Sequence, residues 1–172
     1  MNTIMQKYLD APFKYEFAQN PDMAPTFDIA LAKGINCISL AHLVLKDLYD
    51  VDLPTIYRCS ELYRDTTYFE DIDDFGSTQL GDLVWLGVAN PRVSVENFTP
   101  NYKDGELTNW PDFPVKHVAI HTGENSTADN LLHATYVGKT TTVWPLQKFN
   151  EYPRYKKVYG IKRLKAQFRE HN

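Results

Sequence analysis

The clearest hydrophobic pattern in the chain is an apolar stripe that begins shortly after residue 36. Leu40, Val44 and Leu48 recur every four residues with alanine and leucine beside them, which is the spacing of one buried face of an α-helix. Asn36 is a favourable N-cap residue, and Asp50 is followed four positions later by a proline that a helix would not pass. The pattern therefore predicts an amphipathic helix that starts after Asn36 and ends near Asp50.

The second half of the chain has the pattern of short strands. Segments rich in Val, Ile, Tyr and Trp alternate there with turn residues. These segments are residues 82–87, 116–122, 130–137, 140–146 and 156–164. A second, more polar helix is expected at 60–68, whereas 70–77 is acidic and typical of a turn. Helices followed by five short strands predict an α+β fold.

A chain of 172 residues suits one domain, because it can bury a sizeable core but is short for two. We divide this domain, 1–172, into an N-terminal arm (1–34), a core (35–164) and a tail (165–172). Three prolines between residues 8 and 34 predict that the arm is irregular and lies on the surface.

Residues 88–114 form an unusually long connection between the first two predicted strands. The segment is rich in Pro and Asn and contains the aromatic residues Phe98, Tyr102, Trp110 and Phe113. Two interpretations stay open. The loop is either one wall of a substrate cleft, with Trp110 in contact with substrate, or a surface loop held together by its own aromatic side chains.

Charge and cysteine content narrow the function classes. The net charge of -4 gives no basic patch for a phosphate backbone, so nucleic acid is not an expected partner. Two cysteines, Cys37 and Cys59, do not make a disulfide framework, and a free thiol suits a reducing compartment. The first residues lack the pattern of an export signal, and no apolar run reaches membrane-spanning length. We therefore expect a soluble, initially cytoplasmic protein; its oligomeric state is left open.

Cys37 is the strongest candidate for chemistry. As the first residue of the predicted helix it would face unpaired N–H groups and the positive end of the helix dipole, which favour a thiolate. His117 and His133 follow in two predicted strands, so a nucleophile, a base and a third polar group occur in a workable order. Taken singly, each of the three is more often an inert core residue.

Four short segments together resemble the NlpC/P60 superfamily of papain-like cysteine peptidases. They are Asn36-Cys37 at the helix start, Gln-Leu-Gly-Asp-Leu-Val-Trp at 79–85, His-Val-Ala-Ile at 117–120 and Leu-Leu-His-Ala at 131–134. The order of the segments carries the resemblance, which extends over roughly residues 35–164.

The resemblance implies a papain-like NlpC/P60 fold, with the nucleophile helix packed on an antiparallel sheet of about five strands. It also implies hydrolysis of amide bonds in bacterial cell-wall (peptidoglycan) peptides, without a metal or organic cofactor. By this match Cys37 is the nucleophile, His117 is the base and His133 orients it. The backbone N–H of Cys37 would help to bind the oxyanion. The expected partner is a peptide or small amide substrate.

Five further residues are candidates for substrate binding: Tyr15, Asn36, Ile38, Trp110 and His121. Tyr15 corresponds to an upstream Tyr of the family, and His121 lies four residues after His117, on the same face of a strand. Asn36 and Ile38 stand where the family often has Asp and Ser, which suit a free amine. The sequence therefore gives no charge-assisted contact for an ammonium group. The second thiol, at position 59, has no motif around it and is interpreted as a packing residue or an incidental thiol.

Three alternatives remain at this point. The same Cys and His pair could serve an acyltransferase or thioesterase, which a hydrophobic tunnel would favour. Cys37, His117, His121 and His133 are ligand types that zinc accepts, although they lack the short paired spacing of structural zinc sites. A non-catalytic binding module on the same fold is the third. A wall enzyme without a signal would act on recycled peptides, or leave the cell by lysis or phage-type export.

Overall fold

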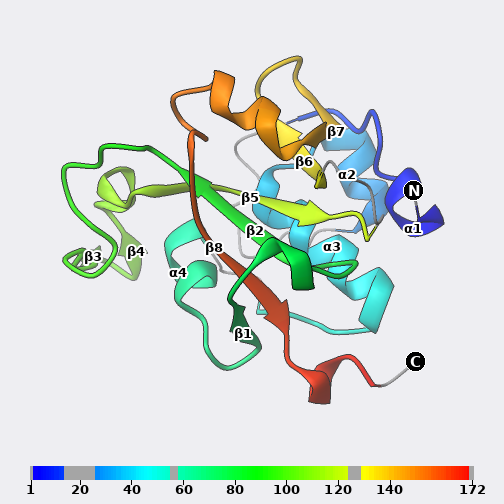
Figure 1. Cartoon of the computed structure of the whole chain (residues 1–172), viewed down its shortest axis with the longest axis horizontal. Coiled ribbons are helices and arrows are strands. Elements are labelled where there is room, and N and C mark those ends of the chain that lie inside the picture. Colours follow the sequence, from blue (N-terminus) through cyan, green and yellow to red (C-terminus); the bar gives the residue numbers. More distant parts are fainter. Residues whose placement is uncertain (1, 14–25, 55–57, 124–128, 171–172) are drawn as a thin grey trace.

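The computed structural model describes residues 2–13, 26–54, 58–123 and 129–170. Its centre is a six-stranded sheet with the strand order β1-β8-β2-β5-β6-β7, in which every neighbouring pair is antiparallel (Figure 1). The strands are β1 (Phe69–Ile72), β2 (Leu83–Gly87), β5 (Val115–His121), β6 (Asn130–Thr135), β7 (Thr140–Pro145) and β8 (Lys157–Leu164). The predicted α+β class is confirmed, with one strand more than expected.

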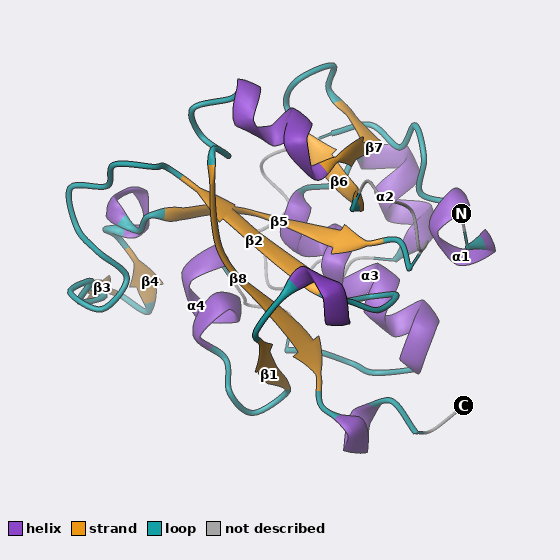
Figure 2. Ribbon diagram, in the orientation of Figure 1, coloured by secondary structure: helices purple, strands orange, loops and turns teal. Residues whose placement is uncertain are grey.

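Short helices surround this sheet, as the purple ribbons around the orange strands in Figure 2 show. The α-helices are α1 (Thr3–Gln6), α2 (Phe27–Lys33), α3 (Cys37–Tyr49) and α4 (Cys59–Arg64). The 3-10 helices are η2 (Phe75–Ser77), η3 (Trp110–Asp112), η4 (Leu146–Glu151) and η5 (Ala166–Phe168). Within the described ranges no helix is long and apolar enough to cross a membrane.

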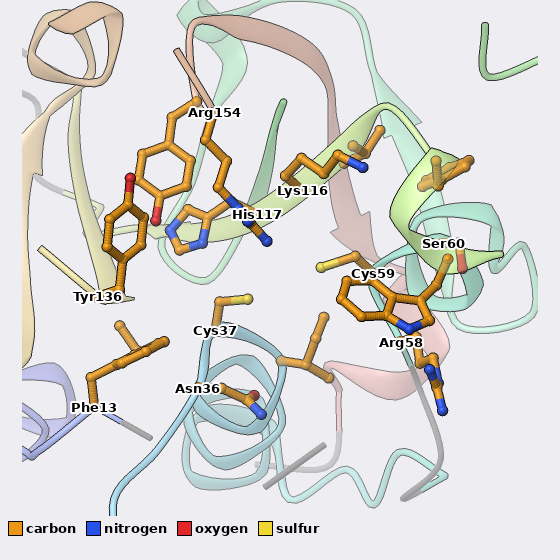
Figure 3. Close-up of a pocket in the computed structure, with 16 residues that line it drawn as sticks. Phe13, Asn36, Cys37, Arg58, Cys59, Ser60, Lys116, His117, Tyr136 and Arg154 are labelled. Carbon is orange, nitrogen blue, oxygen red and sulfur yellow. The ribbon is translucent and has the colours of Figure 1, made fainter. Parts of the chain in front are cut away.

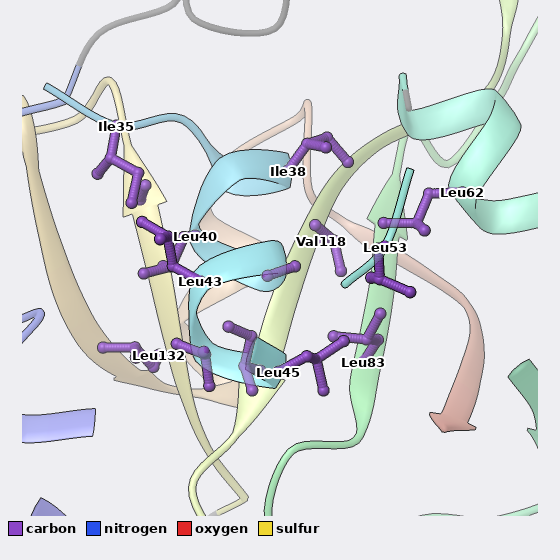
Figure 4. Packing of buried hydrophobic residues seen from close by; sticks show 14 of the residues in the cluster. Ile35, Ile38, Leu40, Leu43, Leu45, Leu53, Leu62, Leu83, Val118 and Leu132 are labelled. Atoms are coloured by element: carbon purple, nitrogen blue, oxygen red, sulfur yellow. The ribbon is translucent and has the colours of Figure 1, made fainter. Parts of the chain in front are cut away.

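The longest helix, α3, has the ends that its sequence predicts. The side chain of Asn36 accepts a hydrogen bond from the backbone N–H of Ser39 at 2.9 Å, which caps the first turn. Asp50 ends the helix in a left-handed conformation, with φ of 53°. Leu40 and Val44 are fully buried, and Figure 4 shows the apolar side chains of α3 packed against strands of the sheet. This packing fixes where the helix begins, and therefore where Cys37 lies.

The sheet is covered on both faces. In β2, Leu83 and Trp85 belong to the apolar cluster that contains α3, whereas Val84 and Leu86 belong to a second cluster. That second cluster includes Phe149 of η4. All four β2 side chains are fully buried, as expected for a strand with helices on both sides. The central strands are thus held rigidly from two directions.

Strand β1 differs from the prediction, because the acidic composition of its segment is typical of a turn. Phe69 and Ile72 pair with Leu164 and Ile161 of β8, while the acidic residues between them are exposed. An edge strand needs only one partner and tolerates charged side chains on its open face, so pairing with β8 outweighs the weak local propensity. The prediction of a turn here was wrong.

The prediction of an irregular surface arm was also wrong for the described part of residues 8–34. The segment contains helix α2, and Tyr8 is fully buried in the core. Asp10 and Phe13 donate backbone hydrogen bonds, both of 2.9 Å, to the carbonyls of Thr141 and Lys139 beside β7. The segment is therefore joined to the sheet by main-chain hydrogen bonds, a long-range arrangement with no local pattern in the sequence.

The long 88–114 connection contains a small hairpin, β3 (Tyr102–Lys103) with β4 (Glu106–Leu107), and the helix η3. Phe98 and Phe113 pack edge to face, with ring centroids 4.9 Å apart. Arg64 of α4 donates hydrogen bonds to carbonyls of the loop at 2.8 and 2.9 Å. The loop is thus held by its own aromatics and by α4.

Candidate active site

Cys37 is the first residue of α3. Because Asn36 is extended, with φ of −108° and ψ of 177°, the helix starts abruptly and the thiol lies where the backbone N–H groups are unpaired. The positive end of a 13-residue helix also acts on this sulfur. Figure 3 shows the Cys37 side chain pointing into a cavity that His117 lines from the opposite side.

The two sequence-predicted histidines lie side by side on neighbouring strands. His117 of β5 and His133 of β6 are buried, and their rings are joined by a hydrogen bond of 3.0 Å between His117 Nε2 and His133 Nδ1. The His117 ring also faces Cys37 across the cavity, and its influence lowers the pKa of the thiol. The structure therefore brings Cys37, His117 and His133 together in one line of polar contacts.

The surroundings of His133 determine its protonation state. Burial, followed by the charges of His117 and Lys148, lowers the pKa of His133 to about 2, so this ring is neutral. Its Nε2 has no hydrogen-bond partner within the described residues and faces an aromatic cage, with Trp144 and Phe149 ring centroids at 4.3 and 4.7 Å. When His117 is protonated, both of its nitrogens donate. His133 must then carry its proton on Nε2 and accept through Nδ1.

Cys59 is the residue that sequence reasoning missed. It is the first residue of α4, and Figure 3 shows its sulfur pointing toward that of Cys37. The Cys59 contact is the largest of the influences that lower the pKa of Cys37; hydrogen bonds from His117 and from the Val118 backbone act in the same direction, and burial opposes them. The pKa of Cys59 is raised by the same contact and by burial. We assign the negative charge to Cys37, because it alone of the two contacts an imidazole.

One local signal could have located Cys59. Glu61 accepts a hydrogen bond of 3.0 Å from the backbone N–H of Arg58, a capping contact at three-residue spacing. That spacing starts α4 at Cys59, one position earlier than our predicted helix. Both cysteines are thus first residues of helices whose N-termini meet at the cavity, but the sequence holds no sign that the two ends meet.

The cavity in front of the two thiols has a volume of about 100 Å³. Aromatic and aliphatic side chains from several elements form most of its wall. The lining residues are Phe13, Asn36, Cys37, Ile38, Arg58, Cys59, Ser60, Trp110, Phe113, Val115, Lys116, His117, Ala134, Tyr136, Arg154 and Tyr155. Of the five residues expected to bind substrate, Asn36, Ile38 and Trp110 are among them, and Trp110 makes the 88–114 loop one wall of the cavity.

The structure does not bring His121 to this cavity. Its Nε2 lies 3.2 Å from Thr78 Oγ1 and its Nδ1 accepts a hydrogen bond of 3.1 Å from the backbone of Gly123. It also lies 3.8 Å from Asp129. Four residues along a strand separate two side chains by about 13 Å, so a shared face does not mean a shared site. The expected binding role of His121 is therefore corrected, and Tyr15 falls outside the described residues.

A β-bulge shapes the start of β5. Leu86 pairs with His117 and the next residue, Gly87, pairs with Val115, so Lys116 is an extra residue without a partner in β2. As a result three consecutive residues, 115 to 117, all line the cavity, although strand residues normally alternate between faces. A side chain at Gly87 would place its Cβ 2.1 Å from the Pro114 carbonyl oxygen. Glycine is required there to keep the bulge.

The four residues considered as zinc ligands are not arranged around a common point. His121 lies apart from Cys37, His117 and His133, and no group of three His, Cys, Asp or Glu side chains arranged to hold a metal occurs in residues 2–13, 26–54, 58–123 and 129–170. The remaining polar contacts join one thiol and two imidazole rings.

No protein-family model matches the chain, and no curated protein matches its sequence. Solved structures do match. An NlpC/P60 family protein from Bacillus cereus ATCC 10987 has a TM-score of 0.54 and 16% identity, over 93% of this chain and 37% of its own.

Two further structures give the same result. A protein described as similar to lipoprotein, NLP/P60 family, from Staphylococcus aureus subsp. aureus Mu50 has a TM-score of 0.53 and 18% identity, over 94% of this chain and 39% of its own. NlpC1 from Trichomonas vaginalis has a TM-score of 0.54 and 16% identity, over 94% and 41%. The chain spans about two fifths of the length of these structures. At these identities the likeness concerns the backbone, and the protein has the fold of the NlpC/P60 proteins.

Proposed function

We propose that this protein is a cysteine hydrolase that cleaves an amide bond, with Cys37 as nucleophile, His117 as base and His133 as the residue that positions His117. One observation carries the proposal. His117 is held through Nε2 by a neutral acceptor at 3.0 Å, while its other edge contacts a thiol at the N-terminus of a helix. A buried ring fixed in this way has one nitrogen directed at the nucleophile.

The reaction follows from these contacts. Transfer of the Cys37 proton to His117 gives a thiolate and imidazolium pair, and the thiolate attacks the substrate carbonyl carbon. The oxyanion is bound by the backbone N–H of Cys37 at the start of α3. His117 then protonates the departing amine as the C–N bond breaks, which leaves an acyl-enzyme. Water, deprotonated by His117, hydrolyses the thioester and restores the thiol.

The substrate class that we propose is a peptide derived from the bacterial cell wall. It is supported by the order of the four sequence segments and by the NlpC/P60 fold. The cavity is suited to a small group beside the scissile bond, because its volume is about 100 Å³. Asn36 and Ile38 offer no charged contact for a free amine, so an N-terminal ammonium group is not part of the proposal.

A thioesterase or acyltransferase is the second candidate, and the apolar lining favours it. The cavity wall offers apolar surface that an acyl chain would cover. This surface includes Phe113, Val115, Ala134 and Tyr155. Both candidates share the acyl-enzyme and differ in the leaving group and in the acceptor. Turnover of matched amide and thioester substrates separates them.

The test compares two cysteine variants on the same peptides. Cys37→Ala and Cys59→Ala each remove one thiol from the same cavity, and mass spectrometry of a panel of wall-derived peptides measures cleavage. We expect Cys37→Ala to lose all cleavage and Cys59→Ala to retain it. If Cys37→Ala cleaves as fast as the wild type, Cys37 is not the nucleophile and the mechanism is wrong.

A further inference from the structure

Cys37 and Cys59 are the two cysteines of the chain, and both line the cavity. Cys37 is the first residue of α3 and Cys59 is the first residue of α4, so the two thiols come from separate helices. Figure 3 shows the two sulfur atoms pointing toward each other, and both cysteines are free. The fold therefore places the only two thiols of the sequence opposite each other in one cavity.

Small oxidants have access to this pair of thiols. Both cysteines are partly exposed rather than enclosed in the core. The cavity volume of about 100 Å³ exceeds what one water molecule needs, so a small hydroperoxide fits beside the sulfur atoms. Hydroperoxides oxidise thiolates faster than thiols, and Cys37 is the thiol whose pKa is lowered, first by its contact with Cys59 and then by His117. Cys37 is therefore the cysteine that a hydroperoxide oxidises first.

The surroundings of Cys59 change when Cys37 is oxidised. Contact with Cys37, burial and the negative charge of Cys37 raise the pKa of Cys59, whereas the charges of Arg154 and Lys116 oppose them. With Arg58, these are the cationic side chains that line the cavity. Conversion of the Cys37 thiolate to a neutral sulfenic acid removes its negative charge and leaves the cations in place. Oxidation of the first thiol therefore makes the second easier to ionise, which favours its attack on the first.

We propose that the two thiols form an oxidative modification site, in which a hydroperoxide oxidises Cys37 and Cys59 resolves the product into a reversible Cys37–Cys59 disulfide. In the first step the Cys37 thiolate attacks the terminal oxygen of the hydroperoxide. The O–O bond breaks, and the leaving alkoxide or hydroxide takes a proton from the His117 imidazolium. In the second step the Cys59 sulfur attacks the Cys37 sulfur, the S–O bond breaks, and the hydroxide leaves as water with the Cys59 proton. The thiols give up two hydrogen atoms, and the hydroperoxide is reduced to an alcohol or water.

The consequence is a nucleophile that is switched off by oxidation without being destroyed. The sulfur of Cys37 has no thiolate in the disulfide, so it does not attack a carbonyl, and a thiol reductant restores it. Without a resolving thiol, a sulfenic acid is oxidised further to sulfinic acid, which thiol reductants do not reverse. The inference goes beyond the hydrolase, because it uses the same thiolate but depends on no particular amide substrate.

Treatment of the purified protein with hydrogen peroxide tests the site without knowledge of the natural substrate. The wild type, Cys59→Ser and Cys37→Ser are each treated at neutral pH, and half of every sample is then reduced with dithiothreitol. Cys59→Ser is the matched variant, because serine keeps a hydroxyl group beside Cys37 but forms no disulfide. Intact mass and peptide mapping without reduction identify the product on each cysteine.

We expect the wild type to lose about 2 Da, the mass of the two hydrogen atoms removed when one disulfide forms. Mapping should place the bond between Cys37 and Cys59, and dithiothreitol should reverse it. Cys59→Ser should instead gain about 32 Da at Cys37, the mass of the two oxygen atoms of a sulfinic acid, and dithiothreitol should not remove them. Cys37→Ser should remain unoxidised over the same time, because the pKa of the remaining thiol is raised by burial.

The outcomes separate this site from the hydrolase. A wild type that gains two oxygen atoms at Cys37, as Cys59→Ser does, overturns the resolving role of Cys59. A wild type that peroxide leaves unchanged, or a disulfide found only between two chains, also overturns it. Cleavage of wall peptides without a Cys37–Cys59 disulfide leaves the hydrolase intact and overturns the site. A reversible Cys37–Cys59 disulfide in a protein that cleaves no amide supports the site and leaves the hydrolase without support.

Discussion

The two ends of strand β5 each carry a buried histidine, and they have opposite character. His117 and His121 are 3% and 4% exposed and lie four residues apart on one strand. His117 lies beside the bulge, between a thiol and a second imidazole. His121 lies where β5 pairs with β6, opposite Leu131, and its two ring nitrogens contact Thr78 and Gly123. One end opens on a cavity and the other is closed by hydrogen bonds.

Under the proposed mechanism, this difference separates a histidine that acts as a base from one that is structural. Burial and strand position are shared by both rings, so neither is sufficient. His117 differs because one nitrogen is held by the neutral ring of His133 and the other faces an ionisable group. Those two partners come from β6 and α3, which are far from β5 in the sequence. The function of the ring is therefore set by tertiary structure.

The most direct test of this difference between the two histidines is to remove each ring in turn. His117→Ala should lower the rate of Cys37 alkylation by iodoacetamide at pH 6 by about 100-fold, because the thiolate loses both the hydrogen bond and the positive charge of His117. His121→Ala is the matched control and should leave the rate within about twofold. Intact mass with mapping of the labelled peptide gives both rates. Equal rates in the two variants would mean that the ends of β5 do not differ as described.

A smaller effect is expected from the residue that holds His117. His133→Ala leaves His117 Nε2–H buried without an acceptor and should slow alkylation of Cys37 by about 10-fold, since a positioning residue changes ring orientation and tautomer. His133→Asn should restore most of the rate, because Asn Oδ1 takes the place of Nδ1 as acceptor. Stopped labelling followed by mass spectrometry compares the three proteins. If Asn and Ala behave alike, His133 acts only through packing.

His133 should also make the pocket end of β5 sensitive to acid. Its pKa is about 2 in the folded protein and near 6.5 in the unfolded chain, so between these values the unfolded chain binds one more proton. The free energy of unfolding must therefore fall as the pH is lowered through this window. The expected loss between pH 6 and pH 5 is about 1 kcal/mol from this residue alone.

Urea unfolding of the wild type and His133→Asn at the two pH values measures that loss. Burial also lowers the pKa of His42, to about 4, but His42 is present in both proteins and cancels in the difference. We expect the His133→Asn protein to lose about 1 kcal/mol less between pH 6 and pH 5 than the wild type. The same pH dependence in both would show that His133 is not the group that resists protonation.

The smallest expected effect concerns the second thiol. Cys59→Ala removes one hydrogen-bonding contact of Cys37 and leaves both the hydrogen bond and the charge of His117 in place, so the pKa of Cys37 should rise by less than on loss of His117. Alkylation of Cys37 at pH 6 should fall by about 3-fold, as for the loss of one hydrogen bond, and should recover at higher pH. The rate as a function of pH, with Ser60→Ala as a neighbouring control, checks this. A rate that falls equally at all pH values would point to a packing effect instead.

Local patterns predicted the helices and strands whose own residues show a clear periodicity or composition. The leucine spacing and the cap at Asn36 gave α3 with the correct ends, and the five Val- and Ile-rich segments are strands within one or two residues of their expected bounds. The order of the NlpC/P60-like segments pointed to Cys37, His117 and His133, which the structure brings together. The elements depend on neighbours a few residues away, whereas the three site residues were identified through the family resemblance and not through a local pattern.

What could not be predicted depends on contacts between distant segments. Phe69 starts a strand only because β8 lies beside it, and Cys59 reaches Cys37 only because two helix N-termini meet. The hydrogen bonds that occupy the His121 ring depend on the segments that carry Thr78 and Gly123. The cations of the cavity come from three separate segments and share no motif. Contacts of this kind produce no periodic pattern in the amino-acid sequence.

The main-chain bonds between residues 10–13 and β7 have a consequence for association between molecules. β7 is the last strand of the sheet, and its outer edge would otherwise present unpaired N–H and C=O groups to a second copy. Asp10 donates to Thr141, whose own N–H is bonded to Ala11 at 2.9 Å, so the edge is already occupied. At the opposite edge β1 is short and exposes Glu70 and Asp71. The N-terminal segment therefore blocks edge-to-edge pairing with another sheet. If this segment detached, the N–H and C=O groups of β7 would be free to bind a strand from another chain.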